Sequence, residues 1–243
     1  MAIVSGGSTR TIARVTFGDV YICAGDGDMS RTVGSLPSAD AILSDAAKNF
    51  TTIRLYGGSS AGWGSAAVGQ NLSQFSALCF LSGRAMQSLY NPTGAVGPVN
   101  VTTPVGLIAA AALGDPPDAL GSRLTDWAPD QTSVRRACAG MMMIQSQPSP
   151  YGVQGIGGAF DKYLAPLQQL ALRGLFWTMG NVDAAKATTD TAAAYALCFE
   201  AAVESWRDGG QIGDWSVSLA QGAGGAYMRT SHQQQHAAAM YIY

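Results

Sequence analysis

Residues 17–30 combine the residue types and spacing that could carry chemistry. An apolar run at 20–24 is followed by Gly-Asp-Gly-Asp-Met-Ser, with glycine at alternate positions. This pattern predicts a buried strand that ends in a tight turn and leads into a helix. In an open α/β sheet, the carboxyl end of a strand and the amino end of the next helix form a crevice with free backbone N–H groups. We therefore expect the functional site at this turn, with Asp26 and Asp28 as ligand-binding residues.

The elements that must position this turn alternate between strands and helices. Apolar runs predict further strands at 51–56, 104–112, 172–178, 215–220 and 240–243. Helical spacing of apolar residues predicts helices at 40–50, 73–90, 132–143, 160–170, 184–208 and 227–236, and another that begins near 116–117. Five or six strands in this alternation predict a flavodoxin-like three-layer α/β/α sandwich with a mostly parallel sheet. Residues 1–17 are predicted to form an N-terminal arm or edge strand before one domain, 18–243.

The composition limits the class of partner. Only 12% of the 243 residues are charged, compared with about a quarter in an ordinary soluble protein. So few charges indicate that much of the surface is covered by partner subunits, as in a homo-oligomer or a larger protein assembly. The net charge of −2, without a basic run, argues against a nucleic-acid partner. No apolar run is long enough to predict a membrane span.

The cysteines and the amino terminus bear on the cellular compartment. Cys23, Cys79, Cys138 and Cys198 are widely spaced, have mostly apolar neighbours and include no Cys-x-x-Cys pair. This pattern favours buried free thiols over a zinc or redox site. The amino terminus has no basic segment followed by an apolar stretch, so we expect no export by an ordinary signal peptide and a cytoplasmic or virion location.

The first segment resembles the sialate O-acetylesterase branch of the SGNH hydrolases. In that family, a Gly-Asp-Val-Trp strand leads into Gly-Gln-Ser-Asn-Met, and the serine is the nucleophile. Here Gly-Asp-Val-Tyr leads into Gly-Asp-Gly-Asp-Met, so Gly27 stands at the serine position. The resemblance continues in unbroken order to about residue 240, through Ile-Arg-Leu-Tyr at 53–56, Phe-Ser-Ala at 75–77, Pro-Val-Gly-Leu-Ile at 104–108 and Trp-Arg at 206–207. It implies an SGNH hydrolase-like fold.

The resemblance also implies that the catalytic set is degenerate. Gly27 has no side chain and cannot attack an acyl carbon. Of the family's Gly-Gly-Thr loop only Gly114 matches, and in its Gln-Gly-Glu block Gly180 is followed by Asn181. The family's closing aspartate and histidine should follow residues 240–243, where the chain ends. The sequence therefore predicts no catalytic residues and a non-catalytic structural or binding module, for which a phage virion decoration, capsid or tail protein is one setting.

An active enzyme is the competing interpretation. Ser30 lies about one helical turn after Gly27, and His232 or His236 could supply a base, which would give a carbohydrate O-acetylesterase with a displaced nucleophile. The two histidines are also spaced to bind a metal from one helix face, but the sequence offers no third ligand. The simpler interpretation is a serine that caps or lines a helix start, with both histidines on a polar helix face.

A binding module without chemistry is the third interpretation. Trp63, in a loop predicted over 57–69, could stack on a sugar ring in a lectin-like site, as could two other predicted loop aromatics, Trp127 and Tyr151. Several carboxylates that the fold would gather near the crevice could hold calcium: Asp26, Asp28, Asp115, Asp118 and Asp183. Loop acids exposed to water and aromatic residues packed on the domain are the simpler interpretations, so we predict no cofactor and no metal site. If a ligand is bound, we expect Asp26, Asp28, Trp63 and Asp115 to bind it.

Overall fold

A six-stranded sheet with the strand order β5-β4-β6-β3-β7-β8 forms the centre of the molecule. The computed structural model describes residues 2–5, 7–11, 15–25, 29–57, 60–90, 103–111, 123–144, 156–178, 189–208 and 216–220. Five of its strands are parallel: Asp19–Gly25 (β3), Ile53–Gly57 (β4), Val105–Ala110 (β6), Gly174–Thr178 (β7) and Ser216–Ala220 (β8). The sixth strand, Ser60–Ser65 (β5), pairs antiparallel with β4 at one edge.

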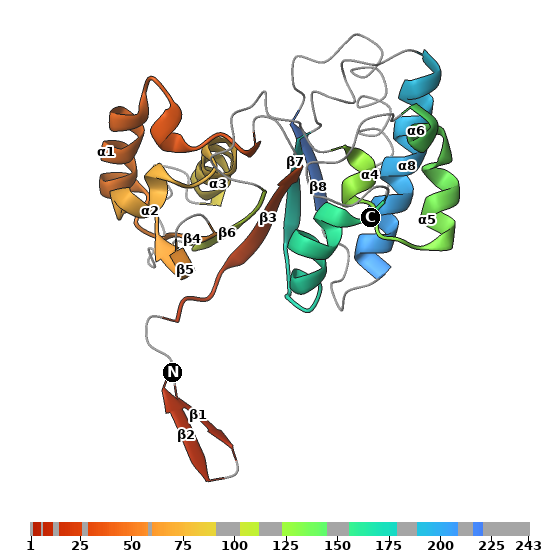
Figure 1. Ribbon diagram of the computed structural model, residues 1–243. Helices are drawn as coiled ribbons and strands as arrows, with labels where there is room; N and C mark the ends of the chain where they lie inside the picture. Colours follow the sequence, from red (N-terminus) through yellow and green to blue (C-terminus); the bar gives the residue numbers. More distant parts are fainter. Residues whose placement is uncertain are drawn as a thin grey trace.

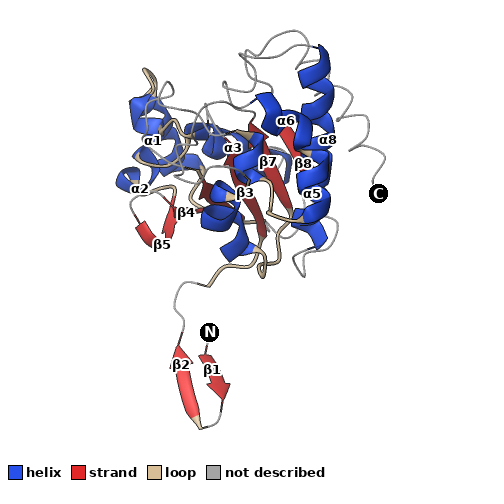
Figure 2. Ribbon diagram, turned by 45° about the vertical axis from the view of Figure 1, so that its right-hand side comes forward, coloured by secondary structure: helices blue, strands red, loops and turns tan. Residues whose placement is uncertain are grey.

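Alternate residues of β3 face two different layers of helices. Tyr21 and Cys23 pack in the same cluster as residues of Ala39–Asn49 (α1), Gly69–Ser73 (α2), Ala77–Tyr90 (α3) and the 3-10 turn Val33–Ser35 (η2). Ile22 and Ala24 pack with the opposite layer, which contains Leu124–Trp127 (α4), Thr132–Ala137 (α5), Ala139–Ile144 (α6), Phe160–Leu164 (η3), Ala165–Leu167 (η4) and Thr189–Asp208 (α8). Helices cover both sides of the sheet in Figures 1 and 2. The predicted three-layer α/β/α sandwich with a mostly parallel sheet is confirmed.

The N-terminal residues form a separate hairpin. Ala2–Ser5 (β1) and Ser8–Thr11 (β2) pair antiparallel, and Gly7 in their turn has a φ of +79°, which favours glycine. Among the described strands, β1 and β2 pair only with each other, and Figure 1 shows the hairpin lying away from the six-stranded sheet. The division at residue 17 between an arm and a domain stays a prediction.

Several element boundaries differ from the sequence predictions. The helix expected over 73–90 begins only at Ala77, as α3, and residues 69–73 before it form the separate short helix α2. The helix expected over 132–143 is interrupted at Cys138 between α5 and α6. The helix expected over 160–170 consists of the short turns η3 and η4. The loop predicted over 57–69 was wrong, because its Gly- and Ser-rich residues 60–65 pair with β4 as strand β5. Strand pairing overrides weak local propensity here. The elements expected near 116–117, at 227–236 and at 240–243 lie outside the described residues.

All four cysteines are paired, so the prediction of free thiols was wrong. Cys23 of β3 is bonded to Cys79 of α3, and Cys138, at the junction of α5 and α6, is bonded to Cys198 of α8. The partners lie 56 and 60 residues apart in sequence, and only the packing of helix on strand or helix on helix brings them together. By the loop-closure entropy of the unfolded chain, each bond contributes roughly 4 kcal/mol to stability.

Glycines allow unusually close packing at both ends of β3. A Cβ atom on Gly18 would lie 2.1 Å from the carbonyl oxygen of Pro104, and one on Gly25 would lie 2.0 Å from the carbonyl oxygen of Thr178. Gly25 also has a φ of +105°, in the region that favours glycine. Only glycine therefore fits where β3 ends beside β7 and the predicted turn begins.

Gly25→Ala should lower the free energy of unfolding by more than about 3 kcal/mol, because the new methyl group meets main chain and the backbone is strained. Gly69→Ala is the matched control, since its Cβ would meet nothing within 4 Å at the exposed start of α2. The control should change stability by less than about 0.5 kcal/mol. Urea denaturation of both variants provides the measurement, and equal stabilities would contradict the close approach of β3 and β7.

A pair of tyrosines ties the end of α3 to β3. The hydroxyl groups of Tyr21 and Tyr90 are 2.5 Å apart, and the Tyr21 ring stacks on Phe176 with a centroid distance of 5.1 Å. Burial, followed by the hydrogen bond with Tyr90 and the nearby charge of Asp19, raises the pKa of Tyr21 above its ordinary value. The neutral hydroxyl is therefore part of the folded structure.

Alkaline pH should destabilise the fold through Tyr21. Because its pKa is raised, the folded protein keeps the Tyr21 proton at pH values where the unfolded chain has lost it. The contribution is fully present below the unfolded tyrosine pKa of about 10 and is lost as the pH rises above it. Urea denaturation from about pH 8 to pH 11 should show a steeper loss of stability for the wild type than for Tyr21→Phe. Identical slopes would contradict the role of this hydroxyl.

Candidate functional site

The carboxyl ends of the central strands meet at one edge of the sheet, as the sequence predicted. The register aligns Ala24 of β3 with Ala110 of β6, and Gly25 of β3 with Thr178 of β7. The segments that follow these strands, 26–28, 112–122 and 179–188, lie outside the described residues. The three blocks in which the family resemblance implies a degenerate catalytic set therefore all begin at the same edge.

Most predicted site residues fall in segments outside those the structure describes, and their roles stay predictions. They are Asp26, Gly27, Asp28, Gly114, Asp115, Asp118, Tyr151, Gly180, Asn181, Asp183, His232 and His236.

Ser30 is described and is only 6% exposed. The neighbouring residues are fixed against the start of α3: the Ser76 hydroxyl donates a hydrogen bond to the Met29 sulfur at 3.4 Å, and the Ala77 N–H donates to the Arg31 carbonyl at 2.8 Å. Ser30 therefore lies in a packed segment beside the start of α3, and its role stays a prediction.

Trp127 lies in the core, so the simpler interpretation, an aromatic residue packed on the domain, is correct for it and the sugar-stacking alternative is not. It ends helix α4 and is 1% exposed. Its ring stacks on Tyr163 at 5.8 Å and meets Trp177 edge to face at 5.6 Å, and its carbonyl accepts a hydrogen bond from the Trp206 indole at 3.0 Å. The sequence predicted a loop at Trp127, but buried aromatic contacts stabilise the single-turn helix α4 there.

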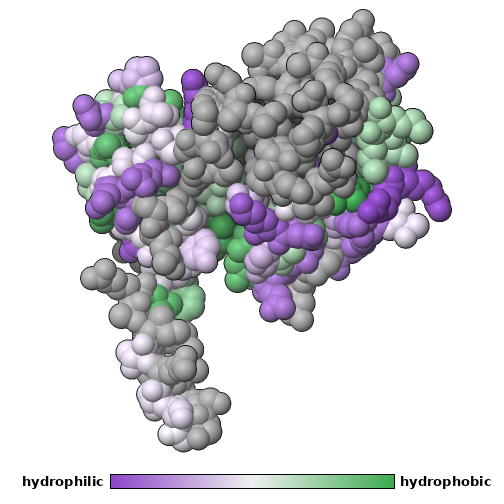
Figure 3. All heavy atoms as spheres, in the orientation of Figure 1, coloured by the Kyte–Doolittle hydropathy of each residue, from purple (hydrophilic) through white to green (hydrophobic). Residues whose placement is uncertain are grey.

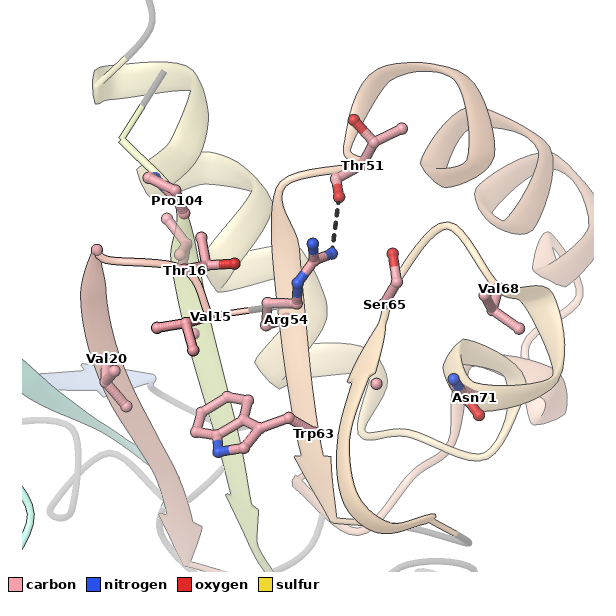
Figure 4. A pocket seen from close by; sticks show the side chains of 14 residues that line it. Val15, Thr16, Val20, Thr51, Arg54, Trp63, Ser65, Val68, Asn71 and Pro104 are labelled. Atoms are coloured by element: carbon pink, nitrogen blue, oxygen red, sulfur yellow. Dashed lines mark hydrogen bonds between the residues drawn. The ribbon is translucent and has the colours of Figure 1, made fainter. Parts of the chain in front are cut away.

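Trp63 lines a cavity of about 830 Å³ at the amino-terminal edge of the sheet, opposite the predicted crevice. A row of residues across four strands, Ser65, Arg54, Gly106 and Val20, lies along one wall of this cavity, because the register pairs each with the next. Figure 4 shows Trp63 among these strands, with Val15 from the segment before β3 close by.

One side of the Trp63 ring lies against the sheet at Gly106, and the other side is open to solvent. Its side chain is 51% exposed. A Cβ atom on Gly106 would lie 3.2 Å from Cη2 and 3.3 Å from Cζ3 of the indole, so the missing side chain of Gly106 makes room for the ring. The Tyr56 ring flanks it at a centroid distance of 5.5 Å. The arrangement leaves an aromatic surface available for stacking.

Polar groups line part of the cavity beside this aromatic surface. The Arg54 guanidinium donates a hydrogen bond of 3.0 Å to the Thr51 carbonyl, drawn as a dashed line in Figure 4. Ser65, Asn71 and Thr16 also line the cavity, and Arg54 is the one charged residue among the described residues that line it. A single cation beside neutral donors and acceptors suits a neutral or weakly acidic ligand with many hydroxyl groups.

The sequence singled out Trp63 but placed it in a loop and not on a strand, and it did not single out Arg54 as a site residue. The available signal was the alternation of side chains along strands. Arg54 and Tyr56 are two residues apart on β4, as are Trp63 and Ser65 on β5, so each pair shares a face. Using that signal required recognising residues 60–65 as a strand.

Metal and membrane sites receive no support from the part of the chain that the structure describes. Within it, no three His, Cys, Asp or Glu residues gather closely enough to bind a metal ion. None of its helices has the length and apolar character needed to cross a membrane.

Comparison with known proteins indicates the class of fold. No family model and no curated protein sequence matches the chain. Among solved structures, XAC1771, a carbohydrate acetylesterase from Xanthomonas citri, is similar with a TM-score of 0.61 and 18% identity, over 90% of this chain and 48% of that chain. The chain thus spans about half the length of that protein. This chain and that protein therefore share an α/β fold, and at this identity the likeness concerns the fold alone.

Gly106→Val should push the Trp63 ring outward and increase acrylamide quenching of tryptophan fluorescence, because the new side chain would occupy the space under the indole. Gly62→Val is the control on β5, where a Cβ would meet nothing within 4 Å, and it should leave quenching unchanged. In a Trp63→Phe background, Gly106→Val should also have no effect. Unchanged quenching in the Gly106→Val single variant would contradict the close packing of the Trp63 ring on Gly106.

Proposed function

We propose that this chain is a non-hydrolytic carbohydrate-binding module on a carbohydrate-esterase-like fold. The observation that carries the proposal is the half-exposed Trp63 ring in a cavity whose lining also includes Arg54, Ser65 and Asn71. Sugars present apolar C–H faces that stack on aromatic rings, while their hydroxyl groups bond to neighbouring polar side chains. The cavity volume of about 830 Å³ falls within the range of roughly 300–1,000 Å³ usual for small-ligand sites.

Two observations support the absence of acyl transfer. Gly27 occupies the position that the family resemblance assigns to the nucleophile, and an acyl-transfer site without a nucleophile cannot form its covalent intermediate. Ser30, the proposed substitute, is buried. The proposed sugar site also lies at the opposite edge of the sheet from the crevice, so binding there does not require the crevice to be intact.

A place in a protein assembly is the second proposal, with further copies of the chain as the partners. It is supported by large apolar side chains open to solvent, of which Phe17 is 81% exposed. Figure 3 shows hydrophobic atoms at the root of the N-terminal hairpin, where Val15 and Phe17 precede β3. Such residues are commonly covered by a partner when they cluster.

The binding test uses tryptophan fluorescence and calorimetry with a panel of neutral and acidic saccharides. At least one saccharide should bind the wild type, and Trp63→Ala should weaken that binding by tenfold or more, which corresponds to about 1.4 kcal/mol of lost stacking. Arg54→Ala should weaken it less. Leu89→Ala, an exposed residue of α3 that does not line the cavity, should bind as the wild type does. Binding that survives Trp63→Ala, or no binding across the panel, would overturn the proposal.

The hydrolysis test uses p-nitrophenyl acetate and O-acetylated sugars. The wild type should show no turnover above background, because Gly27 leaves the nucleophile position that the family resemblance implies without a hydroxyl group. Turnover that Ser30→Ala or His236→Ala abolishes would replace the binding module with a carbohydrate O-acetylesterase, the activity named for the similar Xanthomonas protein. Mass spectrometry of the protein after incubation would also show whether any acyl group stays bound.

A further inference from the structure

Each helical layer of the sandwich contains one disulfide, and both bonds are fully buried. Cys23–Cys79 joins the central strand to α3, and Cys138–Cys198 joins the α5–α6 junction to α8. All four cysteines are 0% exposed. The first pair belongs to the cluster formed with α1, α2 and α3, and the second to the cluster on the opposite face of the sheet.

The surroundings of these bonds exclude soluble thiols from the folded protein. Cys23 has a paired strand on each side, aligned with Ala109 of β6 and Phe176 of β7. The Cys138 sulfur lies 3.9 Å from the Cys198 carbonyl oxygen. Because no small-molecule oxidant or reductant reaches these sulfurs once the core is closed, both bonds must form while the chain is folding.

The reduced state would also fit the cores poorly. Two sulfurs that lose their bond move apart to non-bonded contact distance, and a close-packed interior has little room for that movement. A reducing cytosol keeps folding chains in that state, whereas secreted, periplasmic and extracellular proteins keep structural disulfides. The pairs are therefore part of the folded state and not optional additions to it.

We infer that this chain folds in an oxidising compartment outside the reducing cytosol. For each pair, a thiolate of one cysteine attacks the disulfide of an oxidant of the compartment, either a protein disulfide carrier or glutathione disulfide. The thiolate of the second cysteine then displaces the carrier sulfur. The two thiols lose two protons and two electrons, and the carrier leaves reduced. This inference differs from the cytoplasmic location expected from the amino terminus, and it does not depend on the carbohydrate site.

The test compares the full chain made in the cytosol of a reducing bacterial strain with the same chain exported to the periplasm. Both preparations are denatured with N-ethylmaleimide present, and intact mass counts the free thiols whether or not the protein had folded. The exported protein should carry no adduct, and its peptides should pair Cys23 with Cys79 and Cys138 with Cys198. The cytosolic protein should carry four adducts, and should either fail to fold or unfold at a urea concentration at least about 2.5 M lower.

Paired substitutions separate the two bonds. Cys23→Ala with Cys79→Ala, and Cys138→Ala with Cys198→Ala, should each leave the other bond intact in the exported protein and lower the urea midpoint. A cytosolic protein with four free thiols and the same urea midpoint as the exported protein would overturn the inference. So would free thiols in the folded exported protein, or a bond between cysteines of different layers.

Discussion

The burial of β3 on both faces and along both edges is the constraint on which the rest of the structure depends. Its neighbours β6 and β7 approach so closely that only glycine fits at Gly18 and Gly25. Its alternate side chains divide between two helical clusters, so each layer is aligned against the same strand. The strand that leads into the segment richest in chemical signals is thus also the element that holds the layers together, and a change in its packing affects both layers.

The sequence predicted the architecture because parallel strands buried on both faces appear as continuous apolar runs. Val105–Ala110 and Gly174–Thr178 are such runs, and both were recognised. Strand β5 was missed because glycine and serine make up most of it, and its pairing with β4 stabilises a conformation that its own residues favour weakly. The disulfides were missed for a related reason, since the proximity of Cys138 to Cys198 exists only after α5, α6 and α8 have packed.

The position of the candidate site also depends on strand pairing that the sequence alone does not reveal. An exposed aromatic residue in a Gly-rich stretch was a sound reason to single out Trp63, but its position required the register of β5. That strand returns antiparallel from β4, and the Gly106 position lacks a side chain, so the indole lies over the amino-terminal half of the sheet. Trp127 shows the converse, because a tryptophan within a predicted loop proved to be surrounded by other rings.

The order of the two disulfides along the chain has a consequence for synthesis. Four cysteines allow three connectivities, and this protein has the sequential one, in which each bond closes its own stretch of chain without enclosing a cysteine of the other. When the chain enters the oxidising compartment amino terminus first as it is synthesised, Cys79 reaches Cys23 before Cys138 has entered. Each of the two stretches can then be cross-linked without the other.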